Sequence, residues 1–544
     1  MRYRPPARAI AITGFMGTGK TCVGRLLAAR LGLDFVDTDE AIEAEAGLRI
    51  PAIFERYSEE HFRDLETAAL ARALEAGRSV ISTGGGMLLR EGNVKLLRCA
   101  GPIVCLTATA ECILQRTAGD AGRPLLQVPD PARRIAELLS EREEAYARAD
   151  YHVATTDLTQ AEVVERVVEA LREDPRARWY LGGRAVVPVA LKDSPYQVIV
   201  GRGLLTHVGT LYPPRQRGVC AAVVTTDVVA PLFAEQVMAS LRAGGWEARL
   251  LVVPDGEASK SLAVVSELWD QMAEAGLDRG STVFALGGGV VGDLAGFAAA
   301  AYMRGIDLVH LPTTLLAQVD SSIGGKAAID LSAGKNLVGA FHQPRAVITD
   351  VAALRTLPAA ELRSGLGEVI KHACCFDAEL FEFLEHERES VLSANGPALE
   401  YLVARNCQIK AEVVREDPHE RGLRTTLNYG HTVGHALERA APGWELRHGE
   451  VVGAGMVAEA RIAVWAGICA PEVAERQERL IAAYGLPTWV HGVDEAAALR
   501  ALERDKKIVA GRLRLPLVPE IGSVRIIEDV DIDLVCRALR SVLR

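Results

Sequence analysis

Leu427-Asn-Tyr-Gly-His-Thr-Val-Gly-His-Ala-Leu-Glu438 is the stretch that organises the second half of this 544-residue chain, and Arg447-His-Gly-Glu450 follows it closely. His431 and His435 are four residues apart, so on a helix both imidazoles project from one face. His448 is near enough in sequence to fold back onto them. Nearby histidines that await a carboxylate are a typical beginning of a zinc site.

Glu368 is the strongest carboxylate to complete that site, and it lies upstream in Ser364-Gly-Leu-Gly-Glu-Val-Ile-Lys-His372. The alternative is that the histidines are hydrogen-bonded core residues, which is the better assumption for any single histidine. Several histidines among glycines that permit close backbone approach favour a bound metal ion.

The length and composition indicate an ordinary globular protein of three or four domains. Apolar residues make up 49% of the chain and charged residues 24%. The formal net charge of −10 argues against nucleic-acid binding. The 10 cysteines show no paired CxxC spacing, which predicts reduced thiols in a cytoplasmic protein.

No stretch favours export or a membrane span. The first residues lack the cleavage region of a signal peptide. The most apolar window, 281–303, contains several glycines and Asp293, which favours a buried strand, turn and helix.

A phosphate-binding loop is expected near the amino end. The apolar strand Ala9–Ile12 leads directly into Gly14-Phe-Met-Gly-Thr-Gly-Lys-Thr21, which fits G-x-x-x-x-G-K-[ST] between a strand and a helix. The glycines let backbone N–H groups face phosphate oxygens at a helix N-terminus. Lys20 would reach the β- and γ-phosphates of ATP, and Thr21 would hold Mg²⁺.

Further polar residues follow the loop. Asp37-Thr-Asp39 ends an apolar stretch, so one carboxylate would serve the metal and the other a substrate hydroxyl, although a helix cap is the common alternative. Gly84-Gly-Gly86 ends another strand and would let a ring-shaped substrate lie against backbone. Arg116 and Arg123 lie in a glycine-rich loop able to close over phosphates.

These motifs, with Phe62-Arg63-x-x-Glu66 and Arg142-x-x-x-Tyr146, occur in the order and spacing that resemble shikimate kinases. A gluconate kinase would keep the phosphate loop, but it need not keep Arg63 and Arg142 together with the triple glycine. The resemblance implies an ATP site (Gly14, Gly17, Thr18, Gly19, Lys20, Thr21, Arg116, Arg123), a shikimate site (Asp39, Arg63, Gly85, Arg142), magnesium ligands (Thr21, Asp37) and catalytic roles for Lys20, Asp39 and Arg123.

The chain changes character near 173–183, where charge, proline and glycine are typical of a boundary. Strand patterns resume at 186–191, 196–200 and 219–225, and alternation with helical runs predicts a parallel, Rossmann-type sheet. The expected division is a P-loop domain at 1–174, a linker at 175–186, a Rossmann-like subdomain at 187–357 and a mainly helical subdomain at 358–544.

A nucleotide cleft is predicted in the Rossmann-like part. Gly287-Gly-Gly-Val-Val-Gly-Asp293 follows a strand, which suits a pyrophosphate although it is not the standard G-x-G-x-x-G. Glu257 suits ribose hydroxyls, and Thr313-Thr314 ends another strand. Taken singly these are turns and caps; together they outline a cleft.

Basic residues then gather, and they predict a small substrate that carries phosphate or carboxylate groups. Ordinary surface charge is the alternative for most of them, and it is less favoured for Lys326 and Lys335 in apolar, glycine-rich surroundings. The residues are Arg304, Lys326, Lys335, Lys371, Lys410, Arg424, Lys506 and Lys507.

From about 187 to 544 the ordered motifs resemble 3-dehydroquinate synthases. The resemblance implies Zn²⁺ held by Glu368, His431 and His448, with His435 beside the substrate, in place of the His431–His435 pair on one helix face. It further implies an NAD site (Asp227, Glu257, Lys260, Gly288, Gly289, Val290, Asp293, Thr313, Thr314, Lys335), catalytic residues (Asp320, Lys326, Lys371, Lys410, Arg424, Asn428, His435) and substrate contacts (Arg304, Asn336, and Lys506 or Lys507). Val229 departs from the asparagine expected near the adenosine.

Together the resemblances imply a cytoplasmic bifunctional enzyme. One half would phosphorylate shikimate with ATP and magnesium; the other would convert 3-deoxy-arabino-heptulosonate 7-phosphate to 3-dehydroquinate and phosphate, with zinc and with NAD as a cofactor that is not consumed. No nucleic acid or membrane partner is expected, and the candidate assembly is a homodimer through the synthase half. Two alternatives remain: a related sugar-phosphate cyclase that makes another carbocycle, and a half that is an inactive structural or regulatory module.

Overall fold

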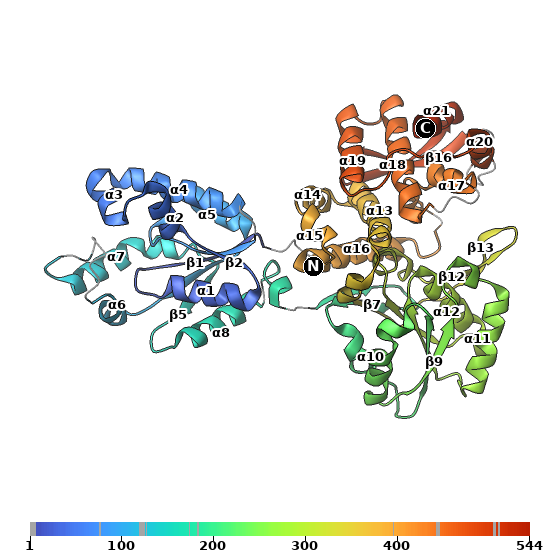
Figure 1. Ribbon diagram of the computed structural model, residues 1–544, viewed down its shortest axis with the longest axis horizontal. Helices are drawn as coiled ribbons and strands as arrows, with labels where there is room; N and C mark the ends of the chain where they lie inside the picture. The colour runs from blue at the N-terminus through green and yellow to red at the C-terminus, as the bar shows by residue number, and fades with distance from the viewer. Residues whose placement is uncertain are drawn as a thin grey trace. The chain divides into compact units, whose positions relative to one another are not determined.

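The computed structural model describes residues 7–75, 78–118, 126, 128–172, 174–181, 184–394, 396–420, 422–441, 446–503, 508–509 and 512–544. The chain folds into two compact units, which meet in sequence between Gly183 and Arg184 (Figure 1). The predicted fold class is confirmed: a parallel α/β unit precedes a Rossmann-like sheet followed by a mainly helical part.

The first unit contains a parallel sheet of five strands in the order β2-β3-β1-β4-β5. The central strand β1 is buried along its whole length, as expected when helices cover both faces of a parallel sheet. The strands are β1 (Ala9–Gly14), β2 (Asp34–Asp37), β3 (Ser79–Ser82), β4 (Ile103–Thr107) and β5 (Tyr151–Ala154).

Helices α1 and α8 cover one face of this sheet, and α4, α5 and α7 cover the other (Figure 1). Each set shares one apolar cluster with the strands beneath it. The helices are α1 (Lys20–Leu31), α2 (Thr38–Ala46), α3 (Ile50–Arg56), α4 (Glu59–Glu75), α5 (Glu91–Ala100), α6 (Ala110–Thr117), α7 (Pro131–Tyr146) and α8 (Gln160–Leu171).

The stretch predicted as a linker begins with ordered structure that belongs to the first unit. Residues Arg178–Leu181 form a 3-10 helix, and Trp179 is only 1% exposed. The Tyr180 hydroxyl donates to the Ala7 carbonyl at 2.5 Å, and the Ala7 N–H donates to the Arg176 carbonyl at 3.0 Å. These bonds join the end of the first unit to the residue Ala7, just before its first strand β1.

The second unit begins with a sheet of seven strands in the order β6-β7-β14-β11-β10-β8-β9. Only the β6–β7 pairing is antiparallel, and β8 pairs in parallel with β9. The predicted strands at 186–191, 196–200 and 219–225 correspond to β6, β7 and β8. The strands are β6 (Ala185–Val189), β7 (Tyr196–Gly201), β8 (Cys220–Thr226), β9 (Glu247–Val253), β10 (Thr282–Gly287), β11 (Asp307–Pro312) and β14 (Ala346–Asp350).

Helices cover both faces of this sheet as well. Helix α10 (Ala230–Ala243), with the short α9 (Val208–Leu211), packs on one face, and α11 (Leu262–Glu274) and α12 (Gly289–Ala301) pack on the other. An antiparallel hairpin of β12 (Lys326–Leu331) and β13 (Gly334–Phe341) lies beside α12.

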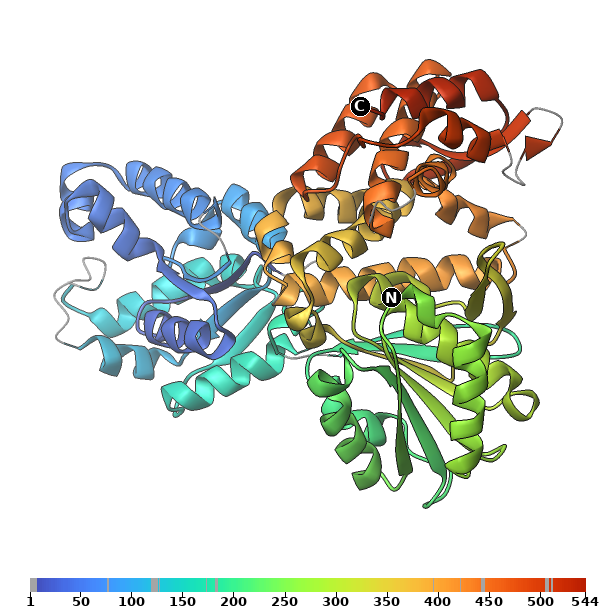
Figure 2. The ribbon, with the colours of Figure 1, turned by 45° about the vertical axis from the view of Figure 1, so that its right-hand side comes forward.

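The remaining chain is mainly helical and contains, before its last helix, a small antiparallel sheet that sequence reasoning did not predict. The long helix α16 packs against β6 and β7 and so joins the helices to the larger sheet (Figure 2). The elements are α13 (Ala359–Phe376), α14 (Ala378–His386), α15 (Arg388–Leu392), α16 (Pro397–Glu416), α17 (His431–Arg439), α18 (His448–Trp465), α19 (Pro471–Ala483), α20 (Glu495–Glu503), β15 (Ile508–Val509), β16 (Arg512–Glu520), β17 (Ser523–Asp531) and α21 (Ile532–Ser541).

Within the described residues, no helix has both the length and the apolar character needed to cross a membrane.

Candidate active sites

The phosphate loop of the first unit connects β1 to α1. Gly14, Gly17 and Gly19 have φ values of 133°, 81° and 90°, a region that side chains disfavour. Lys20 is the first residue of α1, and its Nζ donates to the Phe15 carbonyl at 3.1 Å, so the lysine folds over the loop. The loop therefore exposes the positive end of a helix together with a lysine, an arrangement that suits phosphate.

Asp37 is both a helix cap and a partner of the loop. Its Oδ1 accepts the Asp39 N–H at 3.0 Å, and its Oδ2 accepts the Thr21 hydroxyl at 2.8 Å. Asp39 itself lies in α2 and not on the strand end, so the two acids do not share a strand face as expected. Thr21 and Asp37 are nevertheless adjacent oxygen donors, as a magnesium site requires.

The triple glycine after β3 is surrounded by the acidic and basic residues predicted to bind shikimate. A Cβ on Gly84 would lie 2.7 Å from the Asp39 carboxylate, and a Cβ on Gly86 would lie 2.0 Å from the Arg63 guanidinium. The Gly85 carbonyl accepts the Arg142 guanidinium at 3.3 Å. Only glycine leaves room here, because any side chain would displace these charged groups.

Two buried carboxylates meet at Gly84. A Cβ there would also lie 2.5 Å from the Glu66 carboxylate. Burial raises the pKa of Asp39 to about 6; Lys20 opposes the shift, while Asp37 and Glu66 add to it. Burial also raises the pKa of Glu66, although its ion pair with Arg63, at 2.6 Å, opposes this. Asp39 thus has the character of a general base that works near neutral pH.

Arginine positions differ partly from expectation. Arg142 is buried, as a residue of the predicted shikimate site can be. Arg116 lies in α6 instead of a loop, and its guanidinium donates to the Thr155 hydroxyl at 2.9 Å and to the Gly17 carbonyl at 3.5 Å. Arg123 lies outside the described residues.

In the second unit, the predicted nucleotide-binding residues collect at one edge of the sheet. Strands β11, β10 and β8 are parallel neighbours, so their carboxyl ends point the same way. Asp227 follows β8, Gly288, Gly289 and Val290 open α12 after β10, and Thr313 and Thr314 follow β11. A Cβ on Gly288 would lie 3.0 Å from Thr314, so the turn is tight and its backbone bare. This edge is where parallel α/β sheets bind dinucleotides.

Lys260 joins this edge to the hairpin. Its Nζ, almost fully buried, lies 2.9 Å from an Asp293 carboxylate oxygen, 3.3 Å from Glu257 and 2.5 Å from the Asn336 amide oxygen. Burial lowers the pKa of Lys260, but the surrounding carboxylates outweigh it and hold the pKa above its ordinary value. Lys335 is exposed on β13 and pairs with Glu438 at 2.9 Å.

Three helices meet to form a metal-type site in the second unit. Glu368 lies within α13, while His431 and His448 are the first residues of α17 and α18. The helices approach closely at glycines: a Cβ on Gly449 would lie 1.9 Å from the Ser364 carbonyl, and one on Gly455 would lie 1.9 Å from the Gly430 carbonyl. Backbone contact therefore brings the two helix starts and Glu368 together.

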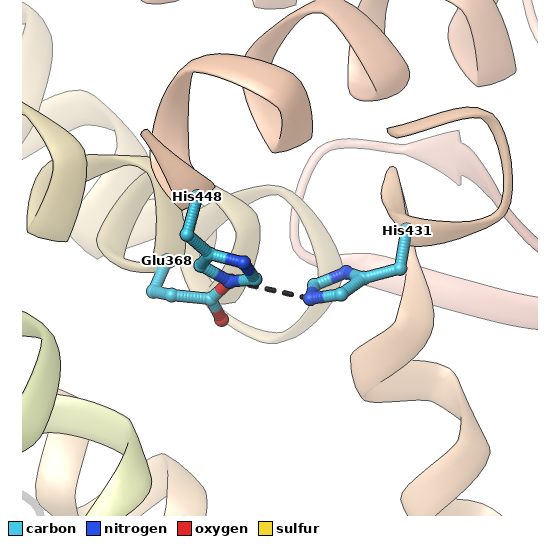
Figure 3. Close-up of side chains that lie close together, drawn as sticks. All are labelled: Glu368, His431 and His448. Atoms are coloured by element: carbon cyan, nitrogen blue, oxygen red, sulfur yellow. Dashed lines mark hydrogen bonds and ion pairs between the residues drawn. The ribbon is translucent and has the colours of Figure 1, made fainter. Parts of the chain in front are cut away.

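The three side chains point toward one another (Figure 3). The Glu368 Oε1 atom lies 3.1 Å from His448 Nε2 and 3.5 Å from His431 Nε2, and the three ligand atoms are within 4.8 Å of one another. The His431 Nδ1 atom contacts the Tyr429 carbonyl at 3.1 Å, which leaves Nε2 free to bind a metal. Two imidazoles and one carboxylate are a known catalytic zinc set with an open position.

The pKa shifts of Glu368 and His431 favour metal binding, whereas that of His448 favours a proton that a metal would displace. Burial disfavours the ionised form of Glu368, but Lys371 and the two histidines outweigh it and hold the pKa well below its usual range. Burial, aided by Lys371, holds the pKa of His431 far below the ordinary value, so the ring is neutral. Burial also disfavours charge on His448, but its hydrogen bond to Glu368 raises the pKa above the ordinary value.

His435 is not part of this ligand group among the described residues, although its ring centroid is 5.3 Å from that of His431. The helix-face pair of His431 and His435 therefore differs from the set that the packing brings together. His448 takes the third place because α18 starts beside Glu368.

A charged cluster adjoins the three ligands. Asp320, in the short π-helix Ala317–Ser321, pairs with Lys410, and Glu368 pairs with Lys371. Burial lowers the pKa of Lys410 to about 8, although Asp320 opposes the shift. Burial disfavours charge on Asp320, but Lys410 and Lys371 hold its pKa below the ordinary range. Buried, alternating charges of this kind suit an anionic, hydroxyl-bearing substrate.

The remaining residues predicted to bind the substrate differ in burial and in their partners. Arg424 is buried and donates to the Gly324 carbonyl at 3.3 Å, while Lys326 is exposed and pairs with Glu420, which Asn428 also contacts. Arg304 is exposed at a turn with φ 70°, and no described contact joins it to the cluster. Lys506 and Lys507 lie outside the described residues.

Two residues that the structure brings into these sites were given no role by sequence reasoning. His372 is fully buried, and its Nε2 atom lies 3.9 Å from Asp320; its spacing of four from Glu368 could have indicated one helix face. Glu66 was noticed only as part of a motif. Its spacing of three from Arg63 on a helix was the available signal.

Comparison with known families agrees with this geometry. The family model for shikimate kinase matches residues 16–172. The models for 3-dehydroquinate synthase match residues 250–364 with the N-terminal description and 365–508 with the C-terminal one.

Individual proteins resemble the second unit. A 3-dehydroquinate synthase from Desulforamulus reducens is 45% identical over 345 residues, which cover 63% of this chain and 96% of that protein. A structure of 2-epi-5-epi-valiolone synthase from Streptomyces hygroscopicus, with NAD⁺ and Zn²⁺ bound, is 30% identical with a TM-score of 0.59 and covers 65% of this chain and 98% of its own. A structure of 2-deoxy-scyllo-inosose synthase with carbaglucose-6-phosphate, NAD⁺ and Co²⁺ is 26% identical, with a TM-score of 0.61, and covers 66% and 100%.

Proposed function

This chain belongs to the 3-dehydroquinate synthase family and carries a shikimate kinase domain ahead of it, and on that premise we propose how its residues divide two reactions. The protein is a bifunctional enzyme of the shikimate pathway. The first unit transfers phosphate from ATP to shikimate with magnesium. The second converts 3-deoxy-D-arabino-heptulosonate 7-phosphate to 3-dehydroquinate and phosphate with NAD and a divalent metal.

In the kinase unit, the triple glycine would form the floor on which shikimate lies. Arg63 and Arg142 on either side would bind its carboxylate, because guanidinium groups match carboxylates in charge and shape. Asp39 would accept the proton of the attacking hydroxyl, and Lys20 would hold the transferred phosphate. Thr21 and Asp37 would hold Mg²⁺. Arg123 would contact the nucleotide phosphates.

In the synthase unit, Glu368, His431 and His448 would hold Zn²⁺, which would supply acidification of a substrate hydroxyl, and NAD would supply reversible hydride transfer. The Asp320, Lys371, Lys410 and Arg424 cluster would surround the sugar acid and orient its anionic groups. The convergence of three metal-type ligands beside this buried cluster is the observation that carries the assignment.

The domain boundaries are part of the same proposal. Residues 1–174 would be the kinase, 187–357 the NAD-binding part and 358–544 the metal- and substrate-binding part; 175–186 would connect them, with Arg178–Leu181 held on the first unit and Ala185 already in β6. The start of α13 at Ala359 supports the last division.

The location and assembly of the enzyme are proposed from simpler features. All 10 cysteines are free thiols, which supports a cytoplasmic location. A homodimer through the synthase unit is supported by β9, an edge strand whose Leu250 and Val252 are 40% and 42% exposed. The mass of the separated synthase unit in solution tests this assembly.

A reciprocal pair of variants tests the two activities in the full chain. We expect Lys20→Met to abolish shikimate-dependent ADP formation and to spare phosphate release from the heptulosonate phosphate. We expect His431→Ala to do the reverse. An inactive module in either half would instead leave one activity absent in the wild type.

The rival for the second unit is another sugar-phosphate cyclase, since the two similar structures are such enzymes. The higher identity to a 3-dehydroquinate synthase favours our assignment. Product analysis decides between them: release of phosphate with a carbocycle other than 3-dehydroquinate would overturn the assignment.

A further inference from the structure

We propose that Glu459 positions His431 for metal binding by capping the helix that His431 begins. The proposal rests on the metal site proposed above and adds a residue to it. Glu459 lies on α18 and is 0% exposed, so its carboxylate is withdrawn from water. A buried carboxylate is costly unless the surrounding groups satisfy it.

The partners of Glu459 are backbone N–H groups at the start of α17. Its Oε2 atom accepts the Gly430 N–H at 2.7 Å, and its Oε1 atom accepts the Thr432 N–H at 3.1 Å and the Val433 N–H at 3.5 Å. The first N–H groups of a helix have no partner within the helix, and its positive end favours a negative charge. Glu459 meets both needs.

Helix α17 has no cap of its own. Its N-cap residue, Gly430, offers no side chain, and its φ of 78° places it in the left-handed region. A Cβ on Gly430 would lie 2.6 Å from Met456, so no larger capping residue fits. The cap is therefore supplied from the neighbouring helix.

His431 lies between residues that Glu459 binds, so its backbone is fixed on both sides. Its ring is oriented by the Tyr429 carbonyl, and the Tyr429 hydroxyl contacts Gln477 on α19 at 2.7 Å. Helix α18 begins at His448 and reaches Glu459 eleven residues later, a rise of roughly 16 Å. One rigid helix thus carries one metal ligand and the brace for another.

Glu459→Gln tests this role, because glutamine keeps the size of the side chain and loses its charge and one acceptor. The full chain is stripped of metal, and the dissociation constants of Zn²⁺ and Co²⁺ are measured by competition with a chelator. We expect binding weaker by about 10–100-fold, the usual effect of removing a residue that orients a ligand, and a changed visible spectrum with Co²⁺. Glu459→Asp, which keeps the charge but withdraws the carboxylate, should give a smaller loss.

Asp377→Asn is the control for loss of a buried carboxylate that caps a helix, and it also removes the ion pair of Asp377 with Arg405. Asp377 is also buried and accepts the Glu379 and Leu380 N–H groups at the start of α14, which carries no metal ligand. We expect this variant to lower the melting temperature of the metal-free protein and to leave metal affinity unchanged.

Two backgrounds show whether Glu459 acts through His431. The effect of Glu459→Gln on metal affinity should vanish when His431 is replaced by alanine and persist when His448 is replaced. An equal effect in both backgrounds, or unchanged metal affinity in Glu459→Gln, would overturn the positioning role and leave the metal site intact. If His431→Ala alone binds metal as the wild type does, the proposed metal site itself is wrong, and this inference with it.

Discussion

The two units each bury a carboxylate at the centre of a site, yet the surroundings move the two pKa values in opposite directions. Burial raises the pKa of Asp39 to about 6; Lys20 acts to lower this pKa, but Asp37 and Glu66 act with burial to raise it. Burial acts in the same sense on Glu368, but Lys371, His431 and His448 outweigh it and hold the pKa well below its usual range.

This difference teaches that burial alone does not decide the role of a carboxylate. Burial, with Asp37 and Glu66 nearby, outweighs Lys20 and raises the pKa of Asp39 to about 6, which suits the general-base role proposed for it. Glu368 is surrounded by cationic and imidazole groups, so it stays charged, as a metal ligand must. The sign of the neighbouring charges distinguishes a carboxylate suited to accept a proton from one that stays ionised to bind a metal.

The largest effect is expected from Glu368→Gln. Loss of the charged ligand also leaves Lys371 buried without its partner, so we expect metal affinity to fall by more than the roughly 100-fold typical of an outer partner, with loss of phosphate release. Metal competition and a phosphate assay measure this. Glu361 is an exposed residue of the same helix, and Glu361→Gln should retain both metal affinity and phosphate release. Kinase activity should be unchanged in both variants. Retained metal binding in Glu368→Gln would contradict the role of Glu368 as a charged metal ligand.

Asp39→Asn should lower kinase turnover by about 10²–10⁴-fold, the usual contribution of a general base. In the wild type, the rate should fall as the pH drops through about 6, because Asp39 then gains a proton and cannot accept the hydroxyl proton. That acidic limb should disappear in the variant. Shikimate-dependent ADP formation from acid to neutral pH measures both, with Glu40→Gln on the same helix as a control. A wild-type rate that is flat through pH 6 would refute the base assignment.

Metal affinity should also fall with decreasing pH. The hydrogen bond to Glu368 raises the pKa of His448, so below that raised pKa a proton competes with the metal for Nε2. We expect affinity to fall about tenfold for each pH unit below it, since one proton is displaced. Chelator competition at several pH values measures this slope. The slope should flatten in His448→Asn; an unchanged slope would assign the proton elsewhere.

The smallest effect is expected from Glu66→Gln. The variant removes a negative neighbour of Asp39, so the pKa of Asp39 should fall and the acidic limb of the kinase should move below pH 6. The Michaelis constant for shikimate should rise as well, because Arg63 loses a buried partner. The pH profile with saturating shikimate separates the two effects. An acidic limb that moves to higher pH would show that Glu66 does not raise the pKa of Asp39.

Much of the first unit was predictable because its chemistry is local in the chain. The phosphate loop is one continuous segment between a strand and a helix, and its glycines reveal the turn directly. The resemblance to shikimate kinases then ordered the distant residues. Sequence reasoning did not show that Asp39 lies in a helix, that Arg142 is buried or that Glu66 meets Asp39 at Gly84.

The second site is spread over more of the chain, and its details depended on packing. Residue spacing favoured His431 with His435 as the ligand pair and placed His448 near them in sequence, but only the resemblance made His448 a ligand in place of His435. The pairing of Asp320 with Lys410 joins residues ninety positions apart, and no local pattern predicts it. The small terminal sheet β15–β17 was also missed.

The sequence by itself determined the alternation of strands and helices, the phosphate loop and the residue types available for metal and anion binding, because periodicity and glycine placement act over a few residues. Tertiary structure alone decided which helix starts touch, which carboxylates keep their protons and which residue caps α17. Those outcomes depend on glycine contacts between helices and on charges brought together from distant segments, and electrostatic energy follows distance in space, not in sequence.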